Sequence, residues 1–312
     1  MPRCRPHAAS LCCDAEGRRA ADSAGSPPGA RPMTAVRTAL SAALAGLLFT
    51  GAGGLSVRAE GAAAVLAPHR AVYDLSLDTR REARGLDQAR GRILFDTVGN
   101  RCEGFTTSFR QVVELSMNGS RLVMDVRTAH FEEGDGSSFR FTSRSSHNGA
   151  AQTETDGTAT RGPDAVNVAV RRPRELTRQI DRAAIFPTEH LIRLVEAARE
   201  GRNVLEVKVY DGAETGEKLY NATAIIGRRI APGAGEVEEA ARDPRLAALA
   251  RWPVTISYFE DGRDSPTPVY SIAFELYENG VSRQLVIHYG EFSLRGDLKS
   301  VEWQPETACA RP

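Results

Sequence analysis

The stretch GFTTSFRQVVEL, residues 104–115, has a period of two in its side chains. One set of alternating positions is largely apolar and consists of Phe105, Thr107, Phe109, Val113 and Leu115. Successive side chains of a β-strand point to opposite faces. The spacing therefore predicts a long strand with one face turned toward a core.

The same period recurs along the chain. It is found in HRAVYDLSL, residues 69–77, and in residues 122–126, 139–141, 166–170, 205–209, 254–258, 270–276 and 285–289. Dipeptides that can supply the positive φ of a tight hairpin are Asn118-Gly119, Asn148-Gly149, Asp156-Gly157, Asp261-Gly262 and Asn279-Gly280. Sequential strands joined by short turns predict an antiparallel meander.

One segment has a helical period. After Phe186-Pro187, apolar residues recur at spacings of three and four, which predicts an amphipathic helix with Thr188 as its N-cap and Gly201 just past its end. These apolar residues are Leu191, Ile192, Leu194, Val195 and Ala198.

A second, short helix is expected from Asp243 as cap to about Ala250, with Pro244 in its first turn. Because no linker divides the strands, we expect residues 60–312 to form a single domain. Numerous strands must curl or close to remove their edges. We predict a mainly β fold, an antiparallel meander curled into an open, spiral-like β-barrel around one main α-helix.

The residues before this domain have a different character. From Met33 the chain carries one basic residue, Arg37, then an uncharged run to Val57, and then Arg58-Ala59. This pattern predicts a cleaved signal peptide over about residues 33–59, preceded by an N-terminal extension that leaves the start at Met1 or Met33 open. A retained membrane span is the alternative, but the apolar core is diluted by Gly and Ala. We therefore expect a periplasmic protein that does not span the membrane when mature.

Cys102 and Cys309 are the cysteines that remain after residue 59. A cysteine pair in an exported chain predicts a disulfide, and a loop of 207 residues gives roughly 5 kcal/mol in the chain-entropy model. Two unrelated thiols or a metal pair are the alternatives, although neither cysteine has the His or Cys neighbours of a metal site.

The charge of the chain is balanced. Residues 1–59 contain 7 of the 40 basic and 3 of the 40 acidic residues, which leaves the remainder with a net charge of about −4. Such a balance predicts no nucleic-acid partner.

No catalytic motif stands out in the sequence. Gly-x-Ser-x-Gly and His-Glu-x-x-His are absent, and no phosphate-binding loop follows residue 59, so we expect no catalytic residue, metal site or cofactor. His190 is weighed as a ligand or base but is expected to cap the helix or face solvent, and His288 is expected at the surface. A calcium loop is considered for Glu132, Glu133 and Asp135, which we interpret as a hairpin tip.

Several stretches together resemble the EipB family of periplasmic cell-envelope integrity proteins. They are PHRAVY (68–73), CEGF (102–105), FPTEHL (186–191), WPVTISYF (252–259) and LYENGVS (276–282), and the resemblance covers most of residues 66–309. It implies an open, spiral-like barrel around a long helix, one disulfide matching Cys102 and Cys309, a role in envelope integrity under stress, and no established enzymatic site. The chain departs from the family in its N-terminal extension and in an insert from Ala231 to Ala241, expected to be disordered.

Functions of different classes fit these observations. The first is a non-catalytic periplasmic protein that supports envelope integrity by binding a protein or peptide partner. The second is a carrier of a lipid or other apolar ligand, and a hydrolase of envelope polymers is a third. We favour the first because bulky inward-facing Phe, Leu, Ile and Tyr side chains predict little open lumen.

Overall fold

The computed structural model describes residues 66–80, 86–307 and 309. Their 15 strands form one sheet, and its first eight strands are β1 His69–Leu77, β2 Gln88–Asn100, β3 Gly104–Met117, β4 Ser120–Glu132, β5 Ser138–His147, β6 Ala150–Arg161, β7 Ala165–Arg172 and β8 Leu176–Asp181. The other seven are β9 Ala184–Ile185, β10 Val204–Val209, β11 Tyr220–Ile226, β12 Arg251–Glu260, β13 Tyr270–Tyr277, β14 Ser282–His288 and β15 Ser293–Trp303. The helices are α1 Pro187–Arg199, the 3₁₀ turn η1 Glu239–Arg242 and α2 Pro244–Ala247.

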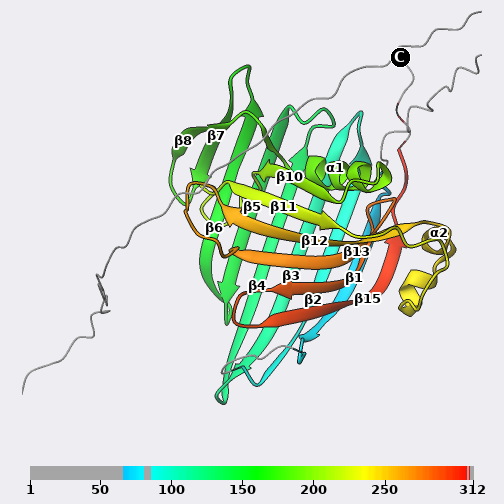
Figure 1. The fold of residues 1–312 in the computed structure, drawn as a ribbon. Helices are drawn as coiled ribbons and strands as arrows, with labels where there is room; N and C mark the ends of the chain where they lie inside the picture. The colour runs from blue at the N-terminus through cyan, green and yellow to red at the C-terminus, as the bar shows by residue number, and fades with distance from the viewer. Residues whose placement is uncertain (1–65, 81–85, 308, 310–312) are drawn as a thin grey trace, which may run out of the picture. The chain divides into compact units, whose positions relative to one another are not determined.

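Two meanders make up this sheet (Figure 1). Strands β1 to β8 follow one another in space, β10 to β15 do the same, and β1 pairs with β15 to join them. Every pair between described strands is antiparallel except β9 with β10, which α1 connects. The predicted meander is confirmed, with the first and last strands of the domain as neighbours.

The sheet curls until its two edge strands approach each other. Strands β8 and β9 are the edges, and only residues 182 and 183 separate them in the chain. No ladder joins β8 to β9 or β10 among the described strands, but Lys208 of β10 lies 3.0 Å from Asp181 of β8. The predicted barrel is therefore confirmed. It is nearly closed, because its edge strands approach each other without pairing.

The Asn-Gly hairpins are confirmed. Asn118 and Asn148 have φ of 49°, and the glycines that follow them also have positive φ, as a tight turn requires. The predicted turn at Asp156-Gly157 is wrong, because both residues lie inside β6 at a register shift against β7. A Cβ atom at Gly157 would lie 2.6 Å from the ring of Phe141, so this glycine serves close packing inside the sheet.

Helix α1 packs against the inner face of the β10–β13 wall (Figure 1). Leu194 and Val195 are buried there as predicted, with 2% and 1% of their surface exposed. Gly201 follows the helix with φ of 74°, also as predicted. Thr188 is not the N-cap; Phe186 holds that position, and the carboxylate of Glu132 accepts hydrogen bonds of 2.8 Å from the backbone nitrogens of Thr188 and Glu189.

The expectation of disorder in residues 231–241 is wrong. This insert forms an ordered strap that continues through η1 into α2, where Asp243 caps as predicted by accepting from the Arg245 nitrogen at 2.8 Å. The strap follows the end of β15, where β14 no longer pairs with it.

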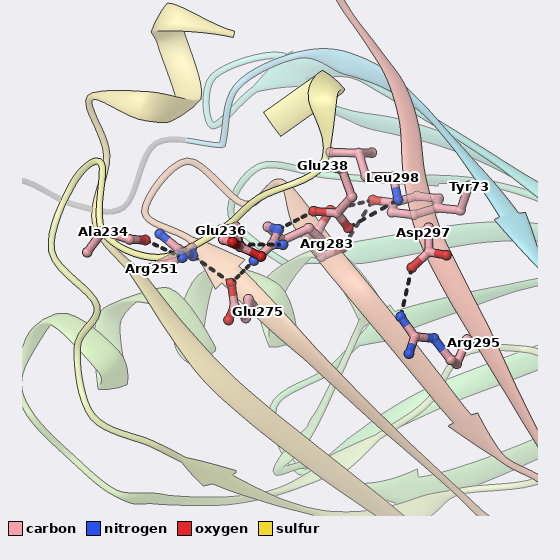
Figure 2. A network of polar contacts seen from close by, with 11 residues as sticks. Tyr73, Ala234, Glu236, Glu238, Arg251, Glu275, Arg283, Arg295, Asp297 and Leu298 are labelled. Atoms are coloured by element: carbon pink, nitrogen blue, oxygen red, sulfur yellow. Dashed lines mark hydrogen bonds and ion pairs between the residues drawn. The ribbon is translucent and has the colours of Figure 1, made fainter. Parts of the chain in front are cut away.

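A cluster of four charged side chains fastens the strap to the sheet (Figure 2). The buried guanidinium of Arg283 lies 2.5 Å from Glu238 of the strap and also contacts Glu275 of β13. Arg251 pairs with Glu275 at 2.5 Å and donates to the Ala234 carbonyl at 2.7 Å. Ala241 of the strap also lies in the hydrophobic core, with Val237 and Ala240 packed against it, so paired buried charges and apolar contacts together hold the segment.

Candidate functional site

An apolar cavity of about 480 Å³ lies inside the curled sheet, partly open to solvent. It is lined from β1 to β4 on one side, from β13 and β14 on the other, and by one residue of α1. The lining consists of Tyr73, Ile93, Phe95, Phe109, Gln111, Val126, Leu191, Tyr270, Ile272, Phe274, Gly280, Ser282, Leu285, Ile287 and Tyr289.

The expectation of little open lumen therefore does not hold for this part of the interior. The inward side chains are as bulky as predicted, but fifteen strands enclose more space than these side chains and α1 occupy. Volumes of about 300–1,000 Å³ are usual for pockets that bind small molecules. This cavity is the candidate functional site.

Polar groups enter the cavity wall at a few positions. The Tyr73 hydroxyl donates to the Ser282 carbonyl at 2.8 Å, and the Gln111 side-chain amide donates to the Tyr289 hydroxyl at 3.1 Å. The Tyr270 hydroxyl has no hydrogen-bond partner among the described residues. None of the lining residues is Asp, Glu, Lys, Arg or His, so the wall carries no charge.

Tyr270 belongs to a cluster of aromatic rings on neighbouring strands. It stacks on Tyr258 with ring centroids 4.5 Å apart, and Tyr220 lies edge-on to both rings. Desolvation raises the pKa of Tyr270 well above its usual value, and the nearby rings and the carboxylate of Asp211 add to the effect. The phenol therefore keeps its proton and acts as a donor across the neutral range.

His190 is buried, contrary to the expectation that it caps the helix or faces solvent. Its ring lies edge-on to Tyr258, at 6.3 Å between centroids, and only 4% of the residue is exposed. Burial lowers the pKa of His190 to about 4, so the ring is neutral at physiological pH. Its Nε2 atom has no hydrogen-bond partner among the described residues, and it is not one of the residues that line the cavity.

His288 lies in β14 and is half-buried, with its Nδ1 atom 2.7 Å from the Ser293 hydroxyl. The expectation of a plain surface residue is therefore too simple. The ring belongs to the pairing of β14 with β15, where His288 is opposite Ser293.

Glu132 also departs from its expected place. Glu133 and Asp135 do lie in the turn between β4 and β5, whereas Glu132 ends β4 and is only 2% exposed. Desolvation outweighs the hydrogen bonds from Thr188 and Glu189 and raises the pKa of Glu132 to about 7. The carboxyl group fixes the start of α1 and thereby the position of Leu191 at the cavity.

Cys102 and Cys309 form a disulfide in the structure, with Cα atoms 5.7 Å apart. Asn100 ties the same two segments together. Its side-chain oxygen accepts from the Cys102 nitrogen at 2.7 Å, and its nitrogen donates to the Thr307 carbonyl at 2.9 Å. The bridge thus links the β2–β3 turn to the tail after β15.

The predicted signal peptide and the extension before it lie outside the described residues. Within residues 66–80, 86–307 and 309, no group of three or more His, Cys, Asp or Glu side chains is placed to hold a metal ion. Nor does that part of the chain contain a helix long and apolar enough to cross a membrane.

Known proteins resemble this chain over most of its length. The model of the EipB-like family matches residues 60–305. The cell envelope integrity protein EipB of Brucella abortus (strain 2308) is 33% identical over 285 residues, which cover 89% of this chain and all of that protein. A crystal structure of a β-barrel-like protein of a domain of unknown function from Brucella abortus superposes with a TM-score of 0.71 at 32% identity, covering 78% of this chain and all of that one. The chain belongs to the EipB-like family.

Proposed function

We propose that this protein is a non-catalytic periplasmic protein that supports cell-envelope integrity by binding an apolar ligand inside its barrel. The observation that carries the proposal is the cavity of about 480 Å³ with its uncharged, mostly apolar wall. A folded protein gains stability when side chains fill its interior, so a cavity that stays open needs an explanation. Cavities of this size are typical of ligand sites.

The envelope role rests on the family. The relative with 33% identity over its whole length carries the name cell envelope integrity protein. Export rests on the sequence pattern of residues 33–59, which precedes the family match at residue 60. Both observations support a periplasmic location.

The chemistry of the wall supports binding without catalysis. General acid–base catalysis needs a titratable group within reach of the ligand, and nucleophilic catalysis needs an activated hydroxyl, thiol or amine. The titratable groups of the wall are phenols, and burial raises their pKa values, to about 12 for Tyr73, so none of them serves as a base at neutral pH. Ser282 contacts the Tyr73 hydroxyl rather than an Asp, Glu, Lys or His side chain.

A protein or peptide partner is the second candidate, favoured by one exposed pair. Val204 of β10 and Ile225 of β11 are opposite each other in the ladder and are 49% and 53% exposed. The edge strand β9 pairs with only Lys208 and Val209 of β10, so the part of β10 that carries Val204 is not covered by another described strand. An exposed apolar pair at such an edge suits the addition of an extended peptide.

Native mass spectrometry of protein purified from the periplasm distinguishes these candidates. We expect a co-purifying small amphiphile, whereas a stoichiometric protein adduct would favour the partner. Binding of the apolar fluorophore N-phenylnaphthylamine then tests the cavity itself. Val126→Trp, which fills the cavity, should abolish binding, and Leu94→Trp, on the exposed face of β2 between two lining residues, should leave binding intact.

A further inference from the structure

The cavity wall has hydrogen-bond donors but no charge. In the pair formed by Gln111 and Tyr289, the amide nitrogen donates to the phenol oxygen at 3.1 Å. The phenol proton of Tyr289 is then directed elsewhere, and no described residue accepts it. A ligand oxygen in the cavity is a suitable acceptor.

Tyr270 offers a second donor on the same side. Its ring is held by stacking on Tyr258 and by the edge of Tyr220, so the hydroxyl is fixed in place although it has no partner of its own. Ser271 is opposite His288 in the antiparallel pairing of β13 with β14, so Tyr270 and Tyr289, which come just before and just after these residues, are neighbours on the cavity wall. A wall that presents two fixed phenol donors beside an apolar surface is built for a ligand with one polar end.

The electrostatics of this neighbourhood disfavour an anion. No Lys, Arg or His lines the cavity, so a carboxylate or phosphate would lose its water without gaining a cation. The polar end that fits is uncharged.

We propose that the cavity binds a single-chain amphiphile with an uncharged, oxygen-bearing head, such as a long-chain alcohol or a monoacylglycerol, whose oxygen accepts hydrogen bonds from Tyr270 and Tyr289. The apolar chain lies against Ile93, Phe95 and Phe109. A volume of about 480 Å³ suits one chain rather than the paired chains of a diacyl lipid. This inference rests on the proposed function, because it specifies the ligand of the same cavity.

The test compares dodecanol with dodecanoate, which share a chain and differ in head charge, as competitors of N-phenylnaphthylamine at neutral pH. We expect dodecanol to compete at a concentration about tenfold lower than dodecanoate. Tyr270→Phe removes one hydroxyl and should weaken dodecanol binding about threefold to tenfold, after the competition is corrected for the affinity of the variant for the fluorophore. Tyr277→Phe is the matched control, since Tyr277 is buried beside Arg251 and does not line the cavity.

Two results overturn this inference while the proposed function stands. One is competition by dodecanoate that equals or exceeds that of dodecanol, and the other is an unchanged dodecanol affinity in Tyr270→Phe. If the wild-type protein binds neither the fluorophore nor dodecanol, both the proposed function and this inference fail. Circular dichroism of each variant shows whether the sheet is intact before binding is compared.

Discussion

Strands β13 and β14 carry two sites of opposite character. Phe274 lines the uncharged cavity, whereas the next residue, Glu275, belongs to the buried charged cluster with Arg251 and Arg283. Neighbouring side chains of a strand point to opposite faces, so the same two strands separate a neutral ligand site from a fully paired ionic one. The charged side chains of these two strands thus fasten the strap to the sheet, and none of them lines the cavity.

The largest effect is expected in the charged cluster. Arg283→Ala leaves Glu238 and Glu275 without their shared partner, and loss of one member of a buried ion pair costs about 3–5 kcal/mol. Urea unfolding followed by circular dichroism measures this loss. Arg92→Ala removes the exposed pair with Asp74 and should cost less than about 1 kcal/mol. Equal losses in the two variants would contradict the structural role of the cluster.

Leu194 of α1 tests the packing of the helix on the inner face of the sheet. Leu194→Ala deletes a fully packed side chain and should cost about 2–5 kcal/mol in the same urea experiment. Leu191→Ala, three residues earlier, opens toward the cavity and should cost less while changing fluorophore binding. A negligible loss for Leu194→Ala would place α1 outside the core.

The disulfide serves as a reference outside both sites. Cys102→Ser, Cys309→Ser and the double variant should lower the free energy of unfolding by similar amounts, because each opens the same 207-residue loop. We expect about 2–4 kcal/mol, the typical range for a disulfide, which lies below the roughly 5 kcal/mol of the chain-entropy model. Thiol titration of the native periplasmic protein should detect no free thiol. Two free thiols, or a double variant as stable as the wild type, would refute the structural role of this bridge.

The smallest effect concerns pH at the start of α1. The folded protein raises the pKa of Glu132 from 4.5 to about 7, so it binds the proton more tightly than the unfolded chain. This group therefore makes its full contribution to stability below about pH 4.5 and loses it as the pH rises to about 7. Glu132→Gln should remove that dependence, by about 2–3 kcal/mol over this window.

The quantity to measure is the difference in unfolding free energy between wild type and Glu132→Gln at each pH, because His190 changes the stability with pH in the opposite direction. Its pKa is lowered from 6.5 to about 4, so its contribution is lost as the pH falls between these values. Glu133→Gln, in the adjacent turn, is the control and should keep the wild-type profile. Parallel profiles for wild type and Glu132→Gln would contradict the buried position of this carboxyl group.

Much of the fold follows from local patterns in the sequence. The alternation of residues 104–115, the Asn-Gly turns and the three-to-four spacing around Leu194 depend only on backbone geometry, which is the same in every protein. They predicted the meander, its curling and the position of the main helix. The expected helix cap at Thr188 failed because a distant residue, Glu132, supplies the acceptor.

The charged cluster and the cavity were decided by tertiary structure. Arg283 and Leu285 are two positions apart and would share a face in a regular strand, but Gln284 has φ of 50° at a register shift in β14. After this bulge Leu285 lines the cavity, while Arg283 pairs with Glu275. The sequence alone does not show where a strand gains one residue relative to its partner. The pattern of apolar residues therefore could not predict which face Arg283 and Leu285 occupy.

The sequence by itself determined that this chain forms an antiparallel β meander with one amphipathic helix, because hydrophobic period and turn chemistry are local. The space inside the barrel was not determined in this way. It depends on how fifteen strands curl and on where α1 starts, and these follow from contacts between residues far apart in the chain, such as Glu132 with Thr188. The same bulky side chains fill a narrow barrel and leave a cavity in a wide one, so only the tertiary structure decided that this interior is open.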